Sequence, residues 1–118
     1  MKTIAKFVVV TLVMGCLTAS SFASPLVPTN VNGRAQAHGR SFANVYLVGG
    51  ESTVISLAGD GDTDLDIYVI DAGDRVIARG IGYTDREVIR FVPAVSGNYR
   101  IEVRNLGNVY NNFNFLVR

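Results

Sequence analysis

The sequence contains one cysteine, one histidine and no tryptophan in 118 residues. Its cysteine, Cys16, lies in an apolar run near the N-terminus, so the rest of the chain has no thiol for a disulfide or for nucleophilic catalysis. Zinc is disfavoured as well, because the single histidine, His38, has no second imidazole or thiol beside it. The sequence also lacks the GxSxG motif of serine hydrolases and the glycine pattern of a phosphate-binding loop. We therefore predict no catalytic residues.

The first 23 residues have the organisation of a secretory signal peptide. Two lysines precede an apolar run from Phe7 to Leu17, and small residues follow as far as Ala23. The run is too short for a membrane-spanning helix, which needs about 20 residues. We predict cleavage after Ala23 and a secreted or periplasmic protein. An alternative stays open, because the sequence VMGC resembles a bacterial lipoprotein processing site, in which a lipid on Cys16 would anchor the chain to the cell envelope.

Residues 24–118 are of a length suited to one small domain. They carry nine arginines, no lysine and ten acidic residues, which is a nearly neutral balance. The arginines are spread from Arg34 to Arg118, which argues against a nucleic-acid partner, since that requires a clustered basic face. The acidic residues are not spread in this way. Six of the ten fall between Asp60 and Asp74, so the charge asymmetry is local and negative.

The chain after residue 40 is predicted to be all-β. Residues 24–40 contain two prolines and two glycines without periodicity, and are interpreted as a linker or lead-in. From residue 41 to residue 118 short alternating segments are separated by glycine, asparagine and aspartate. Tyr99, Ile101 and Val103 share one face of such a segment, which predicts burial of Tyr99. About seven strands in two packed antiparallel sheets account for the pattern, with Gly73 supplying the positive φ of a tight turn.

Three stretches resemble the bacterial pre-peptidase C-terminal domain family, which is related to the collagen-binding modules of clostridial collagenases. They are GDGDTDLDIYVID, YTD and FVPAVSGNYRIEVRNLGNVYNNFNF, and the resemblance covers roughly residues 41–118. It implies a jelly-roll-like β-sandwich without catalytic activity, which in some members binds calcium or a matrix protein. The calcium-binding modules also use acidic residues before the first strand. Residues 24–50 contain none, so that full site does not carry over.

Asp60, Asp62, Asp64 and Asp66 are the candidate metal ligands. Spacing of the D-x-D-x-D type in a curved loop lets carboxylates converge on calcium, the one cofactor that the sequence suggests. An EF-hand is disfavoured, because Leu65 stands where that loop needs glycine. Two alternatives to a metal site stay open. The carboxylates accept backbone N–H bonds in turns, or they pair with arginines across the sheet, for which the candidates are Arg75, Arg79, Arg86 and Arg90.

Tyr83 and Tyr110 lie in predicted loops and are the candidate partner-binding residues, because tyrosine is enriched in interfaces. The sequence as a whole predicts an exported, non-catalytic binding or accessory module for extracellular protein or polysaccharide. A membrane association is expected only if Cys16 is lipidated. Two alternatives are a structural cell-envelope protein without a specific ligand and a small calcium-assisted hydrolase.

Overall fold

A computed structural model of the chain describes residues 28–118; the predicted signal peptide and Cys16 lie outside the described residues. Eight strands follow one another: β2 (Thr29–Ala35), β3 (Arg40–Leu47), β4 (Thr53–Ala58), β5 (Leu65–Ile70), β6 (Val76–Gly80), β7 (Arg86–Phe91), β8 (Gly97–Asn105) and β9 (Asn111–Val117). Within residues 28–118 there is no helix of the length and hydrophobicity needed to cross a membrane.

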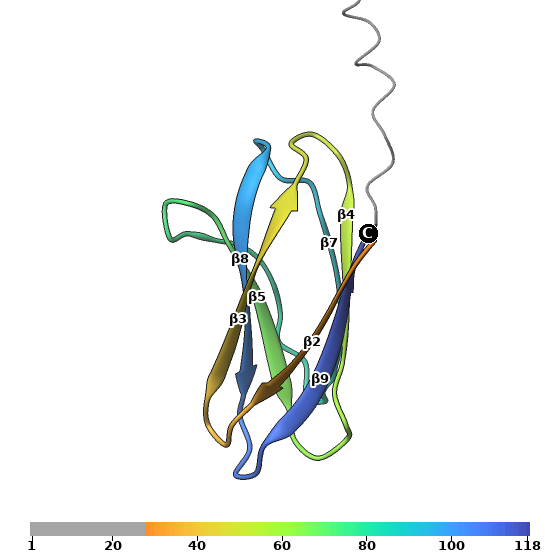
Figure 1. Cartoon of the computed structure of the whole chain (residues 1–118), viewed down its shortest axis with the longest axis vertical. Coiled ribbons are helices and arrows are strands. Elements are labelled where there is room, and N and C mark those ends of the chain that lie inside the picture. The colour runs from red at the N-terminus through yellow and green to blue at the C-terminus, as the bar shows by residue number, and fades with distance from the viewer. Residues whose placement is uncertain (1–27) are drawn as a thin grey trace, which may run out of the picture.

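The strands form two four-stranded antiparallel sheets that pack face to face (Figure 1). One sheet has the order β2-β9-β4-β7 and the other the order β3-β8-β5-β6. Consecutive strands often lie in different sheets, so the chain crosses repeatedly between the two layers. This confirms the all-β sandwich predicted from the sequence, with eight strands in place of about seven.

The additional strand is β2, which corrects the interpretation of residues 24–40 as a linker. β2 pairs with β9 in a continuous register from Thr29 opposite Val117 to Ala35 opposite Asn111. Gly33 fits because a Cβ at that position would lie 2.5 Å from Cζ of Phe113, its partner residue on β9. Asparagine and glycine have low strand propensity, so pairing with β9 rather than local preference decides this strand.

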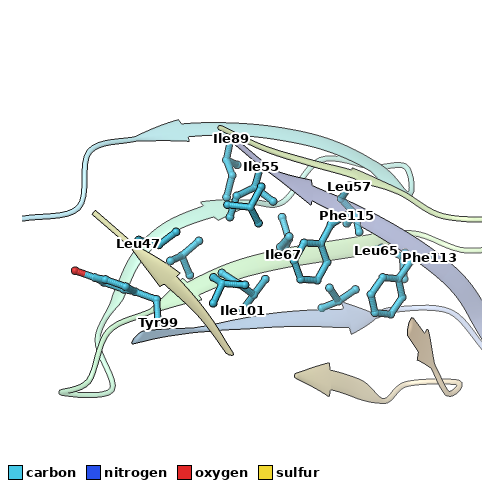
Figure 2. Packing of buried hydrophobic residues seen from close by; sticks show 14 of the residues in the cluster. Leu47, Ile55, Leu57, Leu65, Ile67, Ile89, Tyr99, Ile101, Phe113 and Phe115 are labelled. Carbon is cyan, nitrogen blue, oxygen red and sulfur yellow. The ribbon is translucent and has the colours of Figure 1, made fainter. Parts of the chain in front are cut away.

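The core lies between the sheets and consists of side chains from the inward phase of each strand (Figure 2). Leu65, Ile67 and Val69 of β5 are fully buried, as their alternation predicts. Tyr99 is 4% exposed, which confirms its predicted burial, and its hydroxyl donates to the carbonyl of Val95 at 2.7 Å. The polar tip of this ring is therefore satisfied although the ring itself is in the core.

The β5–β6 turn differs from the prediction in one detail. The positive φ of 62° belongs to Asp74, not to Gly73. Asp71 fixes the turn, because its Oδ1 accepts the backbone N–H groups of Gly73 and Arg75, both at 2.9 Å. These bonds, that of Arg75 first, hold the pKa of Asp71 below its usual value. Aspartate tolerates left-handed backbone when the turn is anchored in this way.

Candidate functional site

Four loops meet at one end of the sandwich, comprising residues 36–39, 59–64, 81–85 and 106–110. Three of these loops, which connect β2 to β3, β4 to β5 and β8 to β9, lie at the lower end of the molecule in Figure 1. Backbone hydrogen bonds of 2.9, 2.9 and 3.0 Å join the loops: His38 N to Gly107 O, Gly59 N to Asp85 O, and Leu106 N to Asp64 O. The structure thus brings the four predicted aspartates, Tyr83 and Tyr110 to the same end of the fold.

Three buried polar residues hold these loops together: Asp85, Asn105 and Asn111. Asp85 is 7% exposed, and its Oδ2 accepts the N–H of Gly61 at 2.5 Å and an amide N–H of Asn111 at 3.3 Å. Asn105 donates to the carbonyls of Ala35 and Val109 at 3.1 and 2.7 Å. Buried polar groups need such partners, so these side chains act as fasteners between loops.

The sequence interpretation missed these three residues, although a signal for two of them was present. Asn105 continues the inward phase of Tyr99, Ile101 and Val103, and Asn111 begins the inward phase of β9. An asparagine at an apolar position of an alternating strand indicates a buried amide with specific partners. Asp85 follows no such pattern, because it lies in a loop.

Asp60 stabilises the β4–β5 loop, whereas Asp62 contributes its backbone N–H. Asp60 Oδ1 accepts the N–H of Asp62 at 3.2 Å, and its Oδ2 accepts the N–H of Asn112 at 2.9 Å. The bond from Asn112 is the main reason that the pKa of Asp60 lies below its usual value. The negative charge of Asp60 in turn raises the pKa of Asp62. Asp60 is therefore a turn residue whose carboxylate accepts backbone N–H bonds.

Asp64 and Asp66 are placed differently, because each has a buried Oδ1 without a hydrogen-bond partner in the described residues. Asp66 is only 7% exposed. Burial is the main cause that raises the pKa of both carboxyls. The negative charge of Asp85 raises the pKa of Asp64 further. For Asp66 the negative charges of Asp64 and Glu87 raise the pKa further, whereas Arg104 and a hydrogen bond with the Tyr68 side chain lower it. Ionised, these two groups are repelled by their neighbours and lack full solvation.

Pairing with arginine involves two of the six aspartates of the acidic segment, Asp71 and Asp74, of which Asp74 pairs with Arg100 at 3.2 Å. Arg75 pairs with Asp71 at 3.0 Å, but Arg79, Arg86 and Arg90 form no ion pair within residues 28–118. Arg104, which lies opposite Asp66 on β8, binds Glu102 instead.

Asp64 and Asp66 are suited to bind calcium because each has a buried Oδ1 without a hydrogen-bond partner in the described residues. Calcium prefers oxygen ligands, and a cation between Asp64 and Asp66 would relieve their burial and mutual repulsion. Asp60 has both carboxylate oxygens occupied by backbone N–H groups. Across the described part of the chain, no three histidine, cysteine, aspartate or glutamate side chains are grouped to hold a metal. Carbonyl or water oxygens would have to complete the coordination.

Tyr83 is the most exposed aromatic side chain at this end, at 96%. Its loop is nonetheless held on both sides. Gly82 donates its N–H to Oε2 of Glu87 at 2.6 Å, and the carbonyl of Thr84 accepts the N–H of Leu65 at 3.2 Å. Tyr110 is 45% exposed and lies against Arg34, with the guanidinium carbon 4.3 Å from the ring centroid.

The arrangement of strands and loops has counterparts among solved structures. A crystal structure of the pre-peptidase C-terminal domain of a collagenase from Bacillus anthracis matches with a TM-score of 0.66, covering 78% of this chain and 90% of that one at 16% identity. The chain shares the fold of the pre-peptidase C-terminal domain. No family model matches the sequence, and no curated protein matches it either.

Two further structures share this pre-peptidase C-terminal fold. A periplasmic inhibitor of g-type lysozyme from Aeromonas hydrophila matches with a TM-score of 0.58, covering 76% of this chain and 83% of that one at 15% identity. A mitogen derived from Yersinia pseudotuberculosis matches with a TM-score of 0.60, covering 77% and 84% at 14% identity. The same fold thus occurs in a lysozyme inhibitor and in a mitogen.

A groove of about 580 Å³ lies between the β5–β6 turn and the β7–β8 loop of this pre-peptidase C-terminal fold. Its walls are largely apolar, and four of its polar side chains are already hydrogen-bonded or ion-paired within the protein. Asp71 binds Arg75, the Tyr99 hydroxyl binds a carbonyl, and Ser96 Oγ accepts the N–H of Gly49 at 2.8 Å. His38, in the β2–β3 turn, is not among the residues that line it. The groove therefore offers no nucleophile with an adjacent base.

Proposed function

We propose that the chain is an exported, non-catalytic binding or accessory module whose loop end contacts extracellular protein or polysaccharide. The observation that carries this proposal is Tyr83, a fully solvated aromatic ring on a loop that hydrogen bonds already hold in place. An exposed aromatic ring gains much from burial against a partner, and a pre-ordered loop loses little entropy on binding.

Export is supported by the signal peptide predicted for residues 1–23, and by the periplasmic location of one protein with the same fold. The absence of catalytic function is supported by the groove, which brings no nucleophile next to a base, and by the occurrence of the fold in a lysozyme inhibitor and a mitogen. Tyr83 and Ile81, which is 49% exposed, provide the apolar part of the proposed contact surface.

The substitution Tyr83→Ala tests this surface. We expect wild-type protein to be retained by an extracellular-matrix or cell-wall preparation, and Y83A to lose about tenfold or more in affinity, as truncation of an interface tyrosine does. The melting temperature should not change, because the ring makes no packing contact. Tyr46→Ala is the matched control, since Tyr46 is also exposed, at 60%, but lies at the C-terminal end of β3. Equal retention of Y83A would contradict the proposal, and retention of neither protein would favour a purely structural envelope role.

We further propose that calcium stabilises the loop end through Asp64 and Asp66. Their unpartnered oxygens support this proposal, because a buried carboxylate oxygen without a donor is costly unless a cation satisfies it. The neighbouring carbonyl of Asp64 already accepts the N–H of Leu106, so the loops are linked at this point. A cation here would add to the partial charge compensation that Arg104 gives Asp66.

Thermal melting in millimolar calcium and in chelator tests the calcium proposal. Because a ligand that binds only the folded state stabilises it by mass action, calcium should raise the melting temperature by about 5 °C. The double substitution Asp64→Asn and Asp66→Asn should abolish this difference while leaving the chelator-treated protein at least as stable. Asp74→Asn, in the distant β5–β6 turn, should retain the calcium response. Coincident melting curves of the wild type would exclude the ion.

A further inference from the structure

The outer face of the β2-β9-β4-β7 sheet presents amide and guanidinium side chains that are not part of the loop end. We propose that this face binds an acidic polysaccharide. It is formed by the outward residues of the four strands and is called the amide–arginine face below, after its two main components. These are the asparagines Asn30, Asn32, Asn112 and Asn114, and the arginines Arg34, Arg86 and Arg90. The proposal concerns a different surface from Tyr83 and goes beyond the function proposed above.

Side-chain hydrogen bonds across β2 and β9 involve all four asparagines, three of them with one another and Asn112 with Arg34. Nδ2 of Asn114 donates to the side-chain oxygens of Asn30 and Asn32, the latter at 3.1 Å. Nε of Arg34 donates to Oδ1 of Asn112 at 2.9 Å. These bonds fix the orientation of each amide. The amide N–H groups of Asn30, Asn32 and Asn112, and Oδ1 of Asn114, are left without a partner among residues 28–118 and serve an external ligand.

This combination of fixed donors and acceptors suits hydroxyl groups. A hydroxyl both donates and accepts a hydrogen bond, so vicinal hydroxyls of a sugar match neighbouring amides. The network places the amides on two adjacent paired strands, with Asn112 opposite Arg34 and Asn114 opposite Asn32. A ligand rich in hydroxyls can therefore contact several oriented amides at once, with little entropy lost by the protein.

The charge of the face selects an anion. Arg34, Arg86 and Arg90 are exposed, and none forms an ion pair within the described part of the chain. The outward positions of β2, β4, β7 and β9 contain no aspartate or glutamate side chain. Asp60 lies at the rim of the face, where it accepts the N–H of Asn112. The face is thus positive although residues 24–118 carry more acidic than basic side chains.

The dimensions favour an extended polymer. Arg86 and Arg90 are four residues apart on β7, or about 13 Å, and Arg34 lies three strands away, or about 14 Å. A single small anion would reach only one guanidinium. Between the arginines lie Val88, which is 64% exposed, and Leu116, which provide apolar surface for the C–H faces of sugar rings. A second copy of the chain is disfavoured, because it would bring arginine against arginine.

The proposal is tested by measuring the affinity of the protein for three polysaccharides. These are polygalacturonate, which carries carboxylates, dextran sulfate, which carries sulfates, and neutral dextran. At low salt we expect binding to polygalacturonate or dextran sulfate, or both, and none to dextran. Arg86→Gln combined with Arg90→Gln should weaken that binding about tenfold, since each rim charge contributes modestly. Arg75→Gln combined with Arg79→Gln removes the same charge from the β5–β6 hairpin and should change affinity less than about twofold.

The substitution Asn32→Ala, with duplex DNA as a comparison ligand, tests whether the face recognises a polysaccharide or any polyanion. We expect N32A to weaken binding to the anionic glycan, and DNA to bind more weakly than the glycan. The proposal is wrong if the protein binds neither anionic glycan, or if the two arginine double variants lose the same affinity. It is also wrong if the protein binds DNA as tightly as the glycan and N32A does not change glycan affinity. Tyr83→Ala should leave glycan affinity intact, so a failure at the loop end and a failure at this face give different results.

Discussion

Asn111→Ala is expected to lower the free energy of unfolding by about 3 kcal/mol, because it removes the buried side-chain hydrogen bonds that link β9 to the neighbouring loops. Asn111 is fully buried and its amide is fully used. Its Oδ1 accepts the N–H of Asp60 at 3.0 Å, and its Nδ2 contacts both oxygens of Thr63 at 3.2 and 3.1 Å. The same Nδ2 lies 3.3 Å from Oδ2 of Asp85. Alanine would leave these groups buried without partners, which costs more than the loss of the bonds themselves.

Chemical denaturation of the variant measures this effect, with Asn112→Ala as the control. Asn112 is the next residue and has the same side chain, but it is exposed and binds only Arg34 through that side chain. The control should lose less than about 0.5 kcal/mol, as surface substitutions do. If N111A and N112A proved equally stable, the loops would not depend on the buried amide.

Removing β2 is expected to have the largest effect of all. A chain that begins at residue 39 should lose about 5 kcal/mol or more relative to one that begins at residue 28, close to the whole stability of a small domain. Without β2 the outer edge of β9 has no partner, and the fully buried Ala35 and the packed Val31 no longer cover the core. Asn105 also loses the carbonyl of Ala35 as an acceptor.

Calorimetry of the two chains gives the answer. A cooperative transition at the same temperature in both would mean that residues 29–35 are dispensable, as the interpretation of a linker implies. The substitution Gly33→Ala examines the same strand without shortening it. Its Cβ would lie 2.5 Å from the buried ring of Phe113, so we expect a loss of about 1–3 kcal/mol. Gly73→Ala is the control, because a Cβ there meets nothing closer than 3.4 Å.

Much of the fold follows from alternation alone. A strand with one buried face places apolar residues at every second position, and this rule identifies β8 and β9 directly, including the burial of Tyr99. β2 could not be found in this way. Its sequence, TNVNGRA, has few residues with strand propensity, and its glycine is explained only by the ring of Phe113 across the ladder.

The candidate site was predictable in part. The acidic composition of residues 59–74 located a loop of unusual charge, and the structure assigns its members different environments. Asp60 is used by backbone N–H groups, whereas Asp64 and Asp66 each retain an unpartnered oxygen. Alternation and spacing cannot separate these cases, because one of the two backbone donors to Asp60 is Asn112, far along the chain.

The amino-acid sequence by itself determined the layered β architecture, the inward positions of the main strands and the acidic character of one connection, because these depend on a local period of two and on composition. The tertiary structure alone decided that residues 29–35 complete a sheet, that Asp85 and Asn111 hold the loops together, and that arginines from β2 and β7 share one face with four asparagines. Each of these depends on which distant residues become neighbours when the two sheets form, and no local pattern specifies that.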